Sequence, residues 1–217
     1  MLYLFDLDGT LIDSERGILG CVRHALTQMR LSIPPSAELR AWIGPPLHTS
    51  FAPLLDHDEA RIHAAIAHYH ERFQRIGWRE YTPYPGMANV VTALRAAGHQ
   101  LAVVTSKPRD HALPIVESLP FASAFNRVYG PQPGARHSEK ATMIAHALSE
   151  FATPPTEAVM IGDRCFDIEG AVATGVRGVG VLWGFGNRAE LAAAGADAIA
   201  TTPGELTTML TQPLSSS

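Results

Sequence analysis

Two aspartates stand at the end of the first hydrophobic run of the chain. Residues 2–5, LYLF, are typical of a short strand buried on both faces of a parallel sheet, and Asp6 and Asp8 follow them. Side chains alternate along an extended chain, so these two carboxylates lie close together on one side. An isolated Asp-x-Asp is typical of a solvated turn. At the carboxyl end of a strand in an open α/β sheet, where ligands bind, the pair instead predicts a magnesium site.

Two further segments place polar side chains at predicted strand ends. Thr105, Ser106 and Lys107 follow the apolar residues 101–104, so hydroxyls and free backbone N–H groups meet at the start of a helix, where anions bind. Ordinary helix capping is the alternative for a Ser or Thr at such a position. In GDRCFD, Asp163 and Asp167 follow residues 158–161. One of these acids is explained by capping, but capping does not explain both.

The first part of the chain, after its opening strand, is predicted to be helical. Apolar residues recur at helical spacing over residues 14–29, 36–43 and 56–73, and no strand pattern occurs between residues 14 and 78. Asp13 or Ser14 is expected to cap the first of these helices, and Asp56 precedes the third. Pro34 and Pro35 are expected to end the first helix. The turn-rich residues 81–86 then lead into a different pattern.

From residue 87 onward helices and strands alternate, which predicts βαβ units and a parallel sheet. Strands are expected over residues 2–5, 101–104, 126–129, 158–161, 178–182 and, at an edge, 196–200. Helices are expected over residues 87–97, 107–118, 138–151, 168–174, 187–194 and 204–210, and the tail 213–217 is expected to fray. The fold class is therefore α/β: a Rossmann-like core of residues 1–13 and 82–217, with an inserted helical cap of residues 14–81 that closes over the aspartates.

Composition excludes several classes of function. The 217 residues are 46% hydrophobic and 18% charged, with a formal net charge of −4, so the chain can bury a sizeable core and lacks the basic excess of a nucleic-acid-binding protein. Cys21 and Cys165 have no metal-ligand spacing and suit buried thiols in a reducing compartment. The ten histidines also lack metal spacing. No stretch reaches about 18 apolar residues, so no membrane span or signal peptide is expected, and we predict a cytoplasmic protein.

The three aspartate- or hydroxyl-bearing segments resemble the motifs of a known family. FDLDGTLIDS, VVTS and GDRCFD are similar, in order, to the first, second and fourth motifs of the haloacid dehalogenase superfamily. Over nearly its whole length the chain looks like the phosphoglycolate phosphatase-like branch, which has a helical C1 cap. The third motif of the family is a lysine near the start of a helix, and Lys140 in HSEKATMIAHAL occupies that place. Many relatives have proline after this lysine, whereas Ala141 follows here, and Lys107 is the alternative.

This resemblance implies a phosphoryl-transfer mechanism through an aspartyl phosphate. Asp6 resembles the nucleophile and Asp8 the general acid and base. A carboxylate oxygen of Asp6, the backbone carbonyl of Asp8 and the carboxylate of Asp163 would hold Mg²⁺, and Asp167 would assist.

The resemblance also implies how the phosphoryl group is bound. Thr105 would bind one of its oxygens, with Ser106 and Lys107 beside it. Lys140 would neutralise developing charge and orient Asp6.

The substrate is expected to be selected by the cap. The loop Gly44-Pro45-Pro46 resembles the loop that relatives lower onto the substrate, and an ordinary rigid turn is the alternative. The segments IGPPL and GVLWGFG also resemble a 5′-nucleotidase-like subgroup, so phosphoglycolate and nucleoside 5′-monophosphates are both candidate substrates. Further candidate contacts in the cap, each with a solvated helix face as the alternative, are Arg40, His48, Arg72 and Arg75.

We therefore expect a magnesium-dependent phosphatase that hydrolyses a small phosphomonoester, as a monomer or homodimer. One alternative is a phosphosugar mutase of the β-phosphoglucomutase type, which uses the same two aspartates. The other is a phosphate-binding protein without turnover, against which the complete set of motif residues argues.

Overall fold

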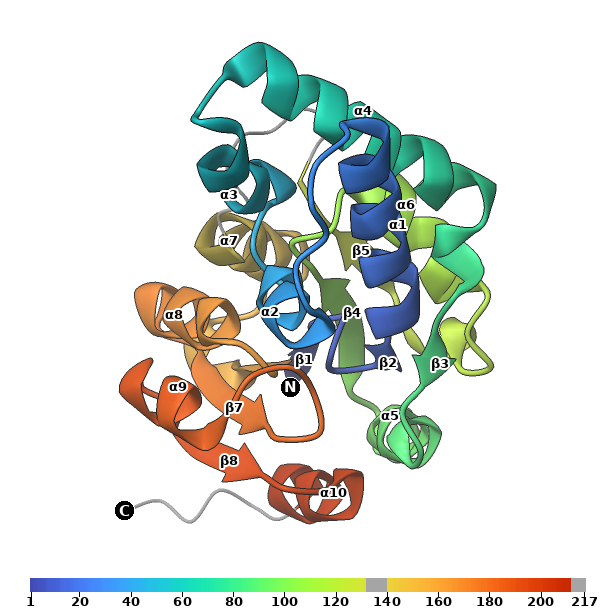
Figure 1. Ribbon diagram of the computed structural model, residues 1–217. Coiled ribbons are helices and arrows are strands. Elements are labelled where there is room, and N and C mark those ends of the chain that lie inside the picture. The colour runs from blue at the N-terminus through green and yellow to red at the C-terminus, as the bar shows by residue number, and fades with distance from the viewer. Residues whose placement is uncertain (132–139, 212–217) are drawn as a thin grey trace.

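The computed structural model describes residues 1–131 and 140–211. Within them, six parallel strands form one sheet in the order β5-β4-β1-β6-β7-β8 (Figure 1). The strands are β1 (Leu2–Phe5), β4 (Gln100–Val104), β5 (Arg127–Tyr129), β6 (Ala158–Gly162), β7 (Arg177–Val181) and β8 (Ala198–Ala200). The predicted α/β fold with a parallel sheet is confirmed, and β8 lies at the predicted edge.

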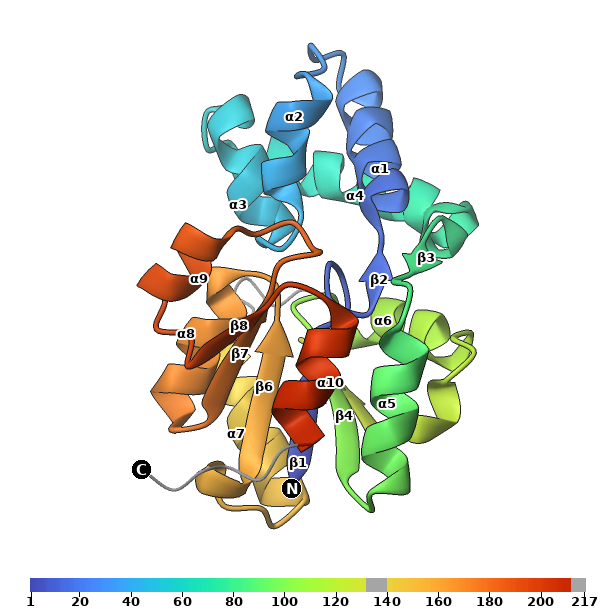
Figure 2. The same cartoon turned by 90° about the horizontal axis from the view of Figure 1, so that it is seen from below.

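Helices cover both faces of this sheet, which buries β1 at its centre. Tyr3 and Phe5 pack in one layer with residues of α5 (Met87–Ala96) and α10 (Pro203–Thr211), which lie on the same face in Figure 2. Leu2 and Leu4 pack in the other layer, with α7 (Lys140–Glu150) and α8 (Cys165–Thr174). The remaining helices of this part are α6 (Arg109–Glu117) and α9 (Arg188–Ala193). Burial on both faces explains why LYLF is apolar without alternation.

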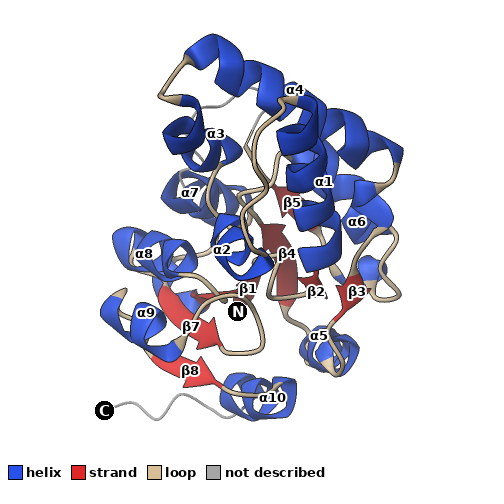
Figure 3. Ribbon diagram, viewed as in Figure 1, coloured by secondary structure: helices blue, strands red, loops and turns tan. Residues whose placement is uncertain are grey.

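Residues 15–79 contain helices and no strand (Figure 3). The helices are α1 (Glu15–Gln28), α2 (Ser36–Leu39), α3 (Leu47–Phe51) and α4 (Glu59–Arg75), and α1 packs along α4. They gather beyond the carboxyl ends of the sheet strands (Figure 2). Where the chain leaves and re-enters the α/β part, β2 (Ile12–Asp13) pairs antiparallel with β3 (Thr82–Pro83). This short ribbon was not expected from the sequence, and the division into core and cap remains a prediction.

Several expected helix boundaries are wrong. The third helix of the block begins after Asp58, whose Oδ1 accepts from the N–H groups of Ala60 (3.0 Å) and Arg61 (3.2 Å). Asp56 instead adopts a left-handed conformation with φ of +51° and ends a 3₁₀ turn. The first helix ends at Gln28, well before Pro34. Residues 47–55, which lie between the second and third predicted helices, form α3 and a 3₁₀ turn.

Two other boundaries show how acids fix helix starts. Ser14 occupies the N-cap position of α1, but its side chain makes no capping hydrogen bond. Instead, Oδ1 of Asp13 accepts from Glu15 N at 3.0 Å. Helix α8 begins at Cys165 rather than residue 168, which makes Asp167 the third residue of its first turn. Cys21 is buried as expected, whereas Cys165 is partly exposed. The predicted start of a helix at residue 138 and the frayed tail at 213–217 lie outside the described residues.

Within residues 1–131 and 140–211, no helix has both the length and the apolar character needed to cross a bilayer. The predicted cytoplasmic location and oligomeric state remain predictions.

Candidate active site

Three buried carboxylates meet one buried ammonium at the carboxyl end of the central strands. Lys140 Nζ lies 2.8 Å from Asp6 Oδ1 and 2.7 Å from Asp167 Oδ1, and it also donates to the carbonyl of Val104 at 3.0 Å. Asp6, Asp163 and Asp167 each offer a carboxylate oxygen within 4.8 Å of the others. The sheet order explains this meeting, because β1 supplies Asp6 and its neighbours β4 and β6 bring the other segments to the same edge.

The electrostatics of this cluster favour a bound cation. Burial raises the pKa of Asp6 to about 7, with Lys140 opposing the shift and Asp167 adding to it. Burial also raises the pKa of Asp163, and the charges of Asp167 and Asp6 raise it further. Burial alone would lower the pKa of Lys140, but Asp167 and Asp6 reverse that effect, so the net shift is upward and the ammonium stays charged. Three carboxylates facing one ammonium leave an excess of negative charge that a divalent cation with oxygen ligands offsets.

The backbone around Asp163 leaves room for its carboxylate and nothing more. Gly9 has φ of +89°, and a Cβ at this position would lie 2.2 Å from Asp163 Oδ2. Asp163 Oδ1 accepts from Thr10 Oγ1 at 3.3 Å, and its Oδ2 accepts from Phe185 N at 2.7 Å. Gly9 therefore allows the segment after β1 to approach Asp163 closely, and Thr10 helps to hold the Asp163 carboxylate in one orientation.

The segment after β4 contributes hydroxyls and a second lysine. Thr105 is buried, and its Oγ1 accepts from Lys107 N at 3.2 Å, which tightens the turn into α6. Thr105, Ser106 and Lys107 all line the same cavity as Asp6. The helix-capping alternative is wrong, because Pro108 occupies the N-cap position of α6 and no side chain caps this helix; the bond of the Thr105 hydroxyl belongs to the preceding turn. Anion binding by this segment stays a prediction.

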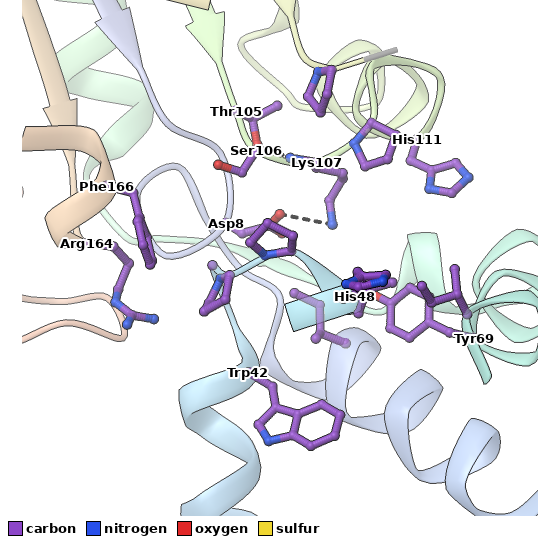
Figure 4. A pocket seen from close by; sticks show the side chains of 18 of the residues that line it. Asp8, Trp42, His48, Tyr69, Thr105, Ser106, Lys107, His111, Arg164 and Phe166 are labelled. Carbon is purple, nitrogen blue, oxygen red and sulfur yellow. Dashed lines mark hydrogen bonds and ion pairs between the residues drawn. The ribbon is translucent and has the colours of Figure 1, made fainter. Parts of the chain in front are cut away.

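Asp8 is held separately from the carboxylate cluster. Lys107 Nζ lies 2.9 Å from Asp8 Oδ2, the contact drawn as a dashed line in Figure 4. Asp8 Oδ1 is buried and has no hydrogen-bond partner among the described residues. Lys107 and Lys140 are the only lysines in the sequence, and both line the cavity. Each aspartate therefore contacts a different lysine: Asp6 contacts Lys140, and Asp8 contacts Lys107.

A cavity of about 240 Å³ separates these groups from the helical block. The predicted loop residues Gly44, Pro45 and Pro46 line it, as does His48. Figure 4 shows Trp42, His48 and Tyr69 around the cavity opposite Thr105 and Ser106. Of the arginines suggested as cap contacts, none lines the cavity: Arg40 pairs with Glu15 at 3.1 Å, Arg72 pairs with Glu80 at 2.7 Å, and Arg75 is exposed.

Several cavity residues were not expected from the sequence. The ten histidines suggested no special role, yet among the described residues four histidines line the cavity: His48, His63, His70 and His111. His70 of α4 meets His111 of α6 with ring centroids 4.8 Å apart. Burial lowers the pKa of both imidazoles, that of His111 to about 4. Helical spacing could have shown that His63 and His70 share one face of α4, but it carries no signal for what that face meets.

Comparison with known proteins agrees with the geometry. The family model described as haloacid dehalogenase-like hydrolase matches residues 3–181, and the chain belongs to this family. The predicted resemblance is thereby confirmed, and so is the prediction of an enzyme, at the level of this hydrolase family.

Three curated relatives have different names. A protein of Pseudomonas aeruginosa named 5′-nucleotidase is 39% identical, with 88% of this chain and 86% of that protein covered. Tyrosine-protein kinase PtkA of Mycobacterium tuberculosis is 35% identical, with 85% of this chain but 63% of that protein covered. A phosphoglycolate phosphatase of Pseudomonas putida is 27% identical, with 85% and 70% covered.

Solved structures share the fold. A protein from Clostridium acetobutylicum described as a predicted phosphatase superposes with a TM-score of 0.91 at 34% identity, covering 96% of this chain and 97% of that one.

Proposed function

We propose that this chain is a magnesium-dependent phosphatase that hydrolyses a small phosphomonoester through an aspartyl phosphate on Asp6. The observation that carries the proposal is that Asp6 and Asp8, two residues apart in the sequence, have different surroundings. Asp6 is fixed by Lys140 at 2.8 Å within the carboxylate cluster, whereas Asp8 faces the cavity with one oxygen unpartnered among the described residues. The first arrangement suits an oriented nucleophile and the second suits a group that exchanges protons.

The two chemical steps follow from these positions. In the first, a carboxylate oxygen of Asp6 bonds to phosphorus, the bond from phosphorus to the ester oxygen breaks, and the proton of Asp8 passes to the departing alkoxide. In the second, Asp8 takes a proton from a water molecule, the water oxygen bonds to phosphorus, and the bond to Asp6 breaks to release inorganic phosphate. In this proposal Thr105, Ser106 and Lys107, which line the cavity, bind the phosphoryl oxygens, and Lys140 offsets their charge.

The buried carboxylates fit Mg²⁺ in their chemistry. Asp6, Asp163 and Asp167 would hold the ion, and the backbone carbonyl of Asp8 is the further ligand that the family resemblance implies. When bound, the ion reduces the repulsion between the anionic nucleophile and the anionic phosphate. The carboxylate of Asp8 lies outside this group of three, and its Oδ2 is 2.9 Å from Lys107 Nζ.

The cavity wall favours a neutral, ring-bearing leaving group of the nucleoside type over phosphoglycolate. The carboxylate of phosphoglycolate, its second anionic group beside the phosphate, needs a free cation, but the three Lys or Arg side chains among the described lining residues all have acidic partners: Lys107, Lys140 and Arg164. The wall contributed by the helical block carries Trp42, Ile66 and Tyr69, together with three histidines, His48, His63 and His70. The name of the 39% identical relative, 5′-nucleotidase, supports the same substrate class.

A substrate panel tests this proposal. Phosphate release from nucleoside 5′-monophosphates, phosphoglycolate and sugar phosphates is measured with Mg²⁺ and compared as kcat/KM. We expect the nucleoside 5′-monophosphates to exceed phosphoglycolate by at least about tenfold, since the latter would leave its second charge without a partner in the cavity. A preference for phosphoglycolate would contradict the assignment of the leaving group.

The PtkA relative and the mutase alternative raise a second candidate function, in which the phosphoryl group passes from Asp6 to an acceptor hydroxyl. The same panel separates the two functions. Hydrolysis releases one phosphate for each alcohol formed, whereas transfer gives alcohol without free phosphate or, for a mutase, an isomerised sugar phosphate. A protein that only binds phosphate would show no product at all.

A further inference from the structure

We propose that Arg164 is a positioning residue that fixes the loop Gly44-Pro45-Pro46 over the site and thereby sets the preference among substrates, with Glu190 holding Arg164 in place. The substrate part of this inference rests on the proposed phosphatase function. The structural part does not, because it concerns a contact between two segments of the chain.

Arg164 lies within the motif that carries two of the buried carboxylates. It follows Asp163 directly, and its backbone N–H donates to Asp167 Oδ2 at 3.1 Å. That bond closes the first turn of α8 and orients the carboxylate whose other oxygen contacts Lys140. The backbone of Arg164 is therefore as fixed as the carboxylate cluster itself.

Its side chain extends from this rigid base to the helical block. Nη1 of Arg164 donates to the carbonyl of Ile43, the residue immediately before the loop. Gly44 has φ of +109°, and a Cβ at this position would lie 3.1 Å from Arg164 Nη1. Glycine thus serves both the left-handed conformation and the close approach of the guanidinium. In Figure 4 Arg164 and Phe166 lie together at one side of the cavity.

Glu190 of α9 holds the guanidinium from the other side. Arg164 Nε lies 2.8 Å from Glu190 Oε1, and the same oxygen accepts from Cys165 N at 2.9 Å. The side chains of Arg164 and Glu190 are only 15% and 20% exposed, so this ion pair is partly shielded from solvent. Glu190 does not line the cavity, so its effect on the loop passes through Arg164 and the start of α8.

A planar guanidinium suits this task because it donates in two directions at once. Nε donates to the carboxylate of Glu190, and Nη1 donates to the carbonyl of Ile43. These two bonds connect α9, the start of α8 and the loop. A lysine has a single nitrogen on a flexible stem and would satisfy one partner at the expense of the other. Loss of the contact would remove this link between the loop and the start of α8.

Two variants test the inference, each with a matched control. Arg164→Met keeps most of the stem and removes every donor, and Arg188→Ala on the exposed start of α9 is its control. Glu190→Gln removes the charge behind Arg164, and Glu169→Gln on the exposed face of α8 is its control. Arg164→Lys is the conservative variant, and it replaces Arg164→Met in the test if Arg164→Met does not fold.

The first readout is hydrogen–deuterium exchange of the backbone amides of Ile43, Gly44 and Leu47 without substrate, since Pro45 and Pro46 have no amide hydrogen. We expect exchange about tenfold faster in Arg164→Met, an intermediate rate in Glu190→Gln, and wild-type rates in both controls. Unchanged exchange in Arg164→Met and Arg164→Lys would overturn the inference. This readout decides the question even if no phosphatase activity is found, so failure of the proposed function remains distinguishable.

The second readout is the ratio of kcat/KM for the best natural phosphate to that for p-nitrophenyl phosphate. A charge-assisted hydrogen bond is strong enough for a tenfold effect, so we expect this ratio to fall about tenfold in Arg164→Met, mainly through a higher KM for the natural substrate. Glu190→Gln should lower the ratio in the same direction, and Arg164→Lys should restore part of it. A ratio that stays constant across all three variants would show that Arg164 has only a structural role.

Discussion

The ammonium of Lys107 lies 2.9 Å from Oδ2 of Asp8, while the other oxygen of Asp8 has no partner among the described residues. Lys140 holds Asp6 at nearly the same distance, 2.8 Å. Each aspartate of the opening motif thus has its own lysine. Because Lys107 occupies only one oxygen, Asp8 keeps the other for the proton transfers that the proposed reaction needs.

Replacement of Asp8 by Asn is expected to lower kcat by about two to four powers of ten, the usual contribution of a general acid and base. Asn retains the size of the side chain but carries no exchangeable carboxyl proton. Steady-state kinetics with Mg²⁺ measure the loss, and Asp110→Asn on the exposed face of α6 is the control. Activity within about threefold of the wild type would show that another group carries the proton.

The two lysines are expected to differ in importance. Lys140→Ala should reduce turnover more than Lys107→Ala, because Lys140 forms ion pairs with both Asp6 and Asp167 in a buried cluster. We expect at least about a tenfold difference in kcat between the variants, measured on protein whose folding has been checked by circular dichroism. Equal losses would mean that both ammonium groups act on the phosphate, and the reverse ranking would transfer the main role to Lys107.

Magnesium is expected to stabilise the folded protein through the buried carboxylates. At a concentration about 100 times its Kd, a ligand that binds only the folded state adds about 2.7 kcal/mol, which raises Tm by several degrees in a chain of this size. Asp163→Asn should abolish the rise produced by MgCl₂ relative to EDTA, whereas Glu169→Gln should retain it. An undiminished shift in Asp163→Asn would place the ion elsewhere.

The motif residues could be predicted from the sequence because their positions depend on local structure. A buried strand followed by an acid or a hydroxyl places that group at the carboxyl edge of a parallel sheet, as it does for Asp6, Thr105 and Asp163. The cavity wall could not be predicted in this way. His70 of α4 meets His111 of α6, and Arg164 reaches Ile43 across 121 positions of sequence. Periodicity identifies a helix face but does not identify what packs on it.

Helix starts show a second limit of the sequence. Asp56 and Asp58 are equally able to cap a helix by residue type, and only the left-handed backbone at Asp56 excludes Asp56 as the cap. Such a choice depends on how the preceding turn packs, which the local sequence does not specify.

The contact between α4 and α6 is expected to weaken in acid. The pKa of His111 is about 4 in the folded protein because of burial, with His70 and Lys107 lowering it and Asp110 opposing them, against 6.5 in the unfolded chain. The unfolded chain therefore binds more protons between pH 6.5 and 4, so stability is complete above pH 6.5 and falls as the pH drops through this window.

His111→Gln should remove this dependence. We expect the variant to lose about 1 kcal/mol less than the wild type between about pH 7 and pH 5, a value discounted because His111 is only partly buried and solvent screens its charge. Urea unfolding at the two pH values measures the difference, with His146→Gln on the exposed face of α7 as the control. The same pH dependence in His111→Gln and wild type would show that His111 does not control it.

The most direct test of the central proposal is phosphate release from a nucleoside 5′-monophosphate by the wild type and by Asp6→Asn, each with MgCl₂ and with EDTA. The amide is nearly the same size as the carboxylate but is a poor nucleophile, so the variant should keep its fold. We predict turnover only in the wild type with Mg²⁺ and no more than a few per cent of that rate in the other three conditions. Substantial release by folded Asp6→Asn, or by the wild type in EDTA, would contradict a magnesium-dependent mechanism through Asp6.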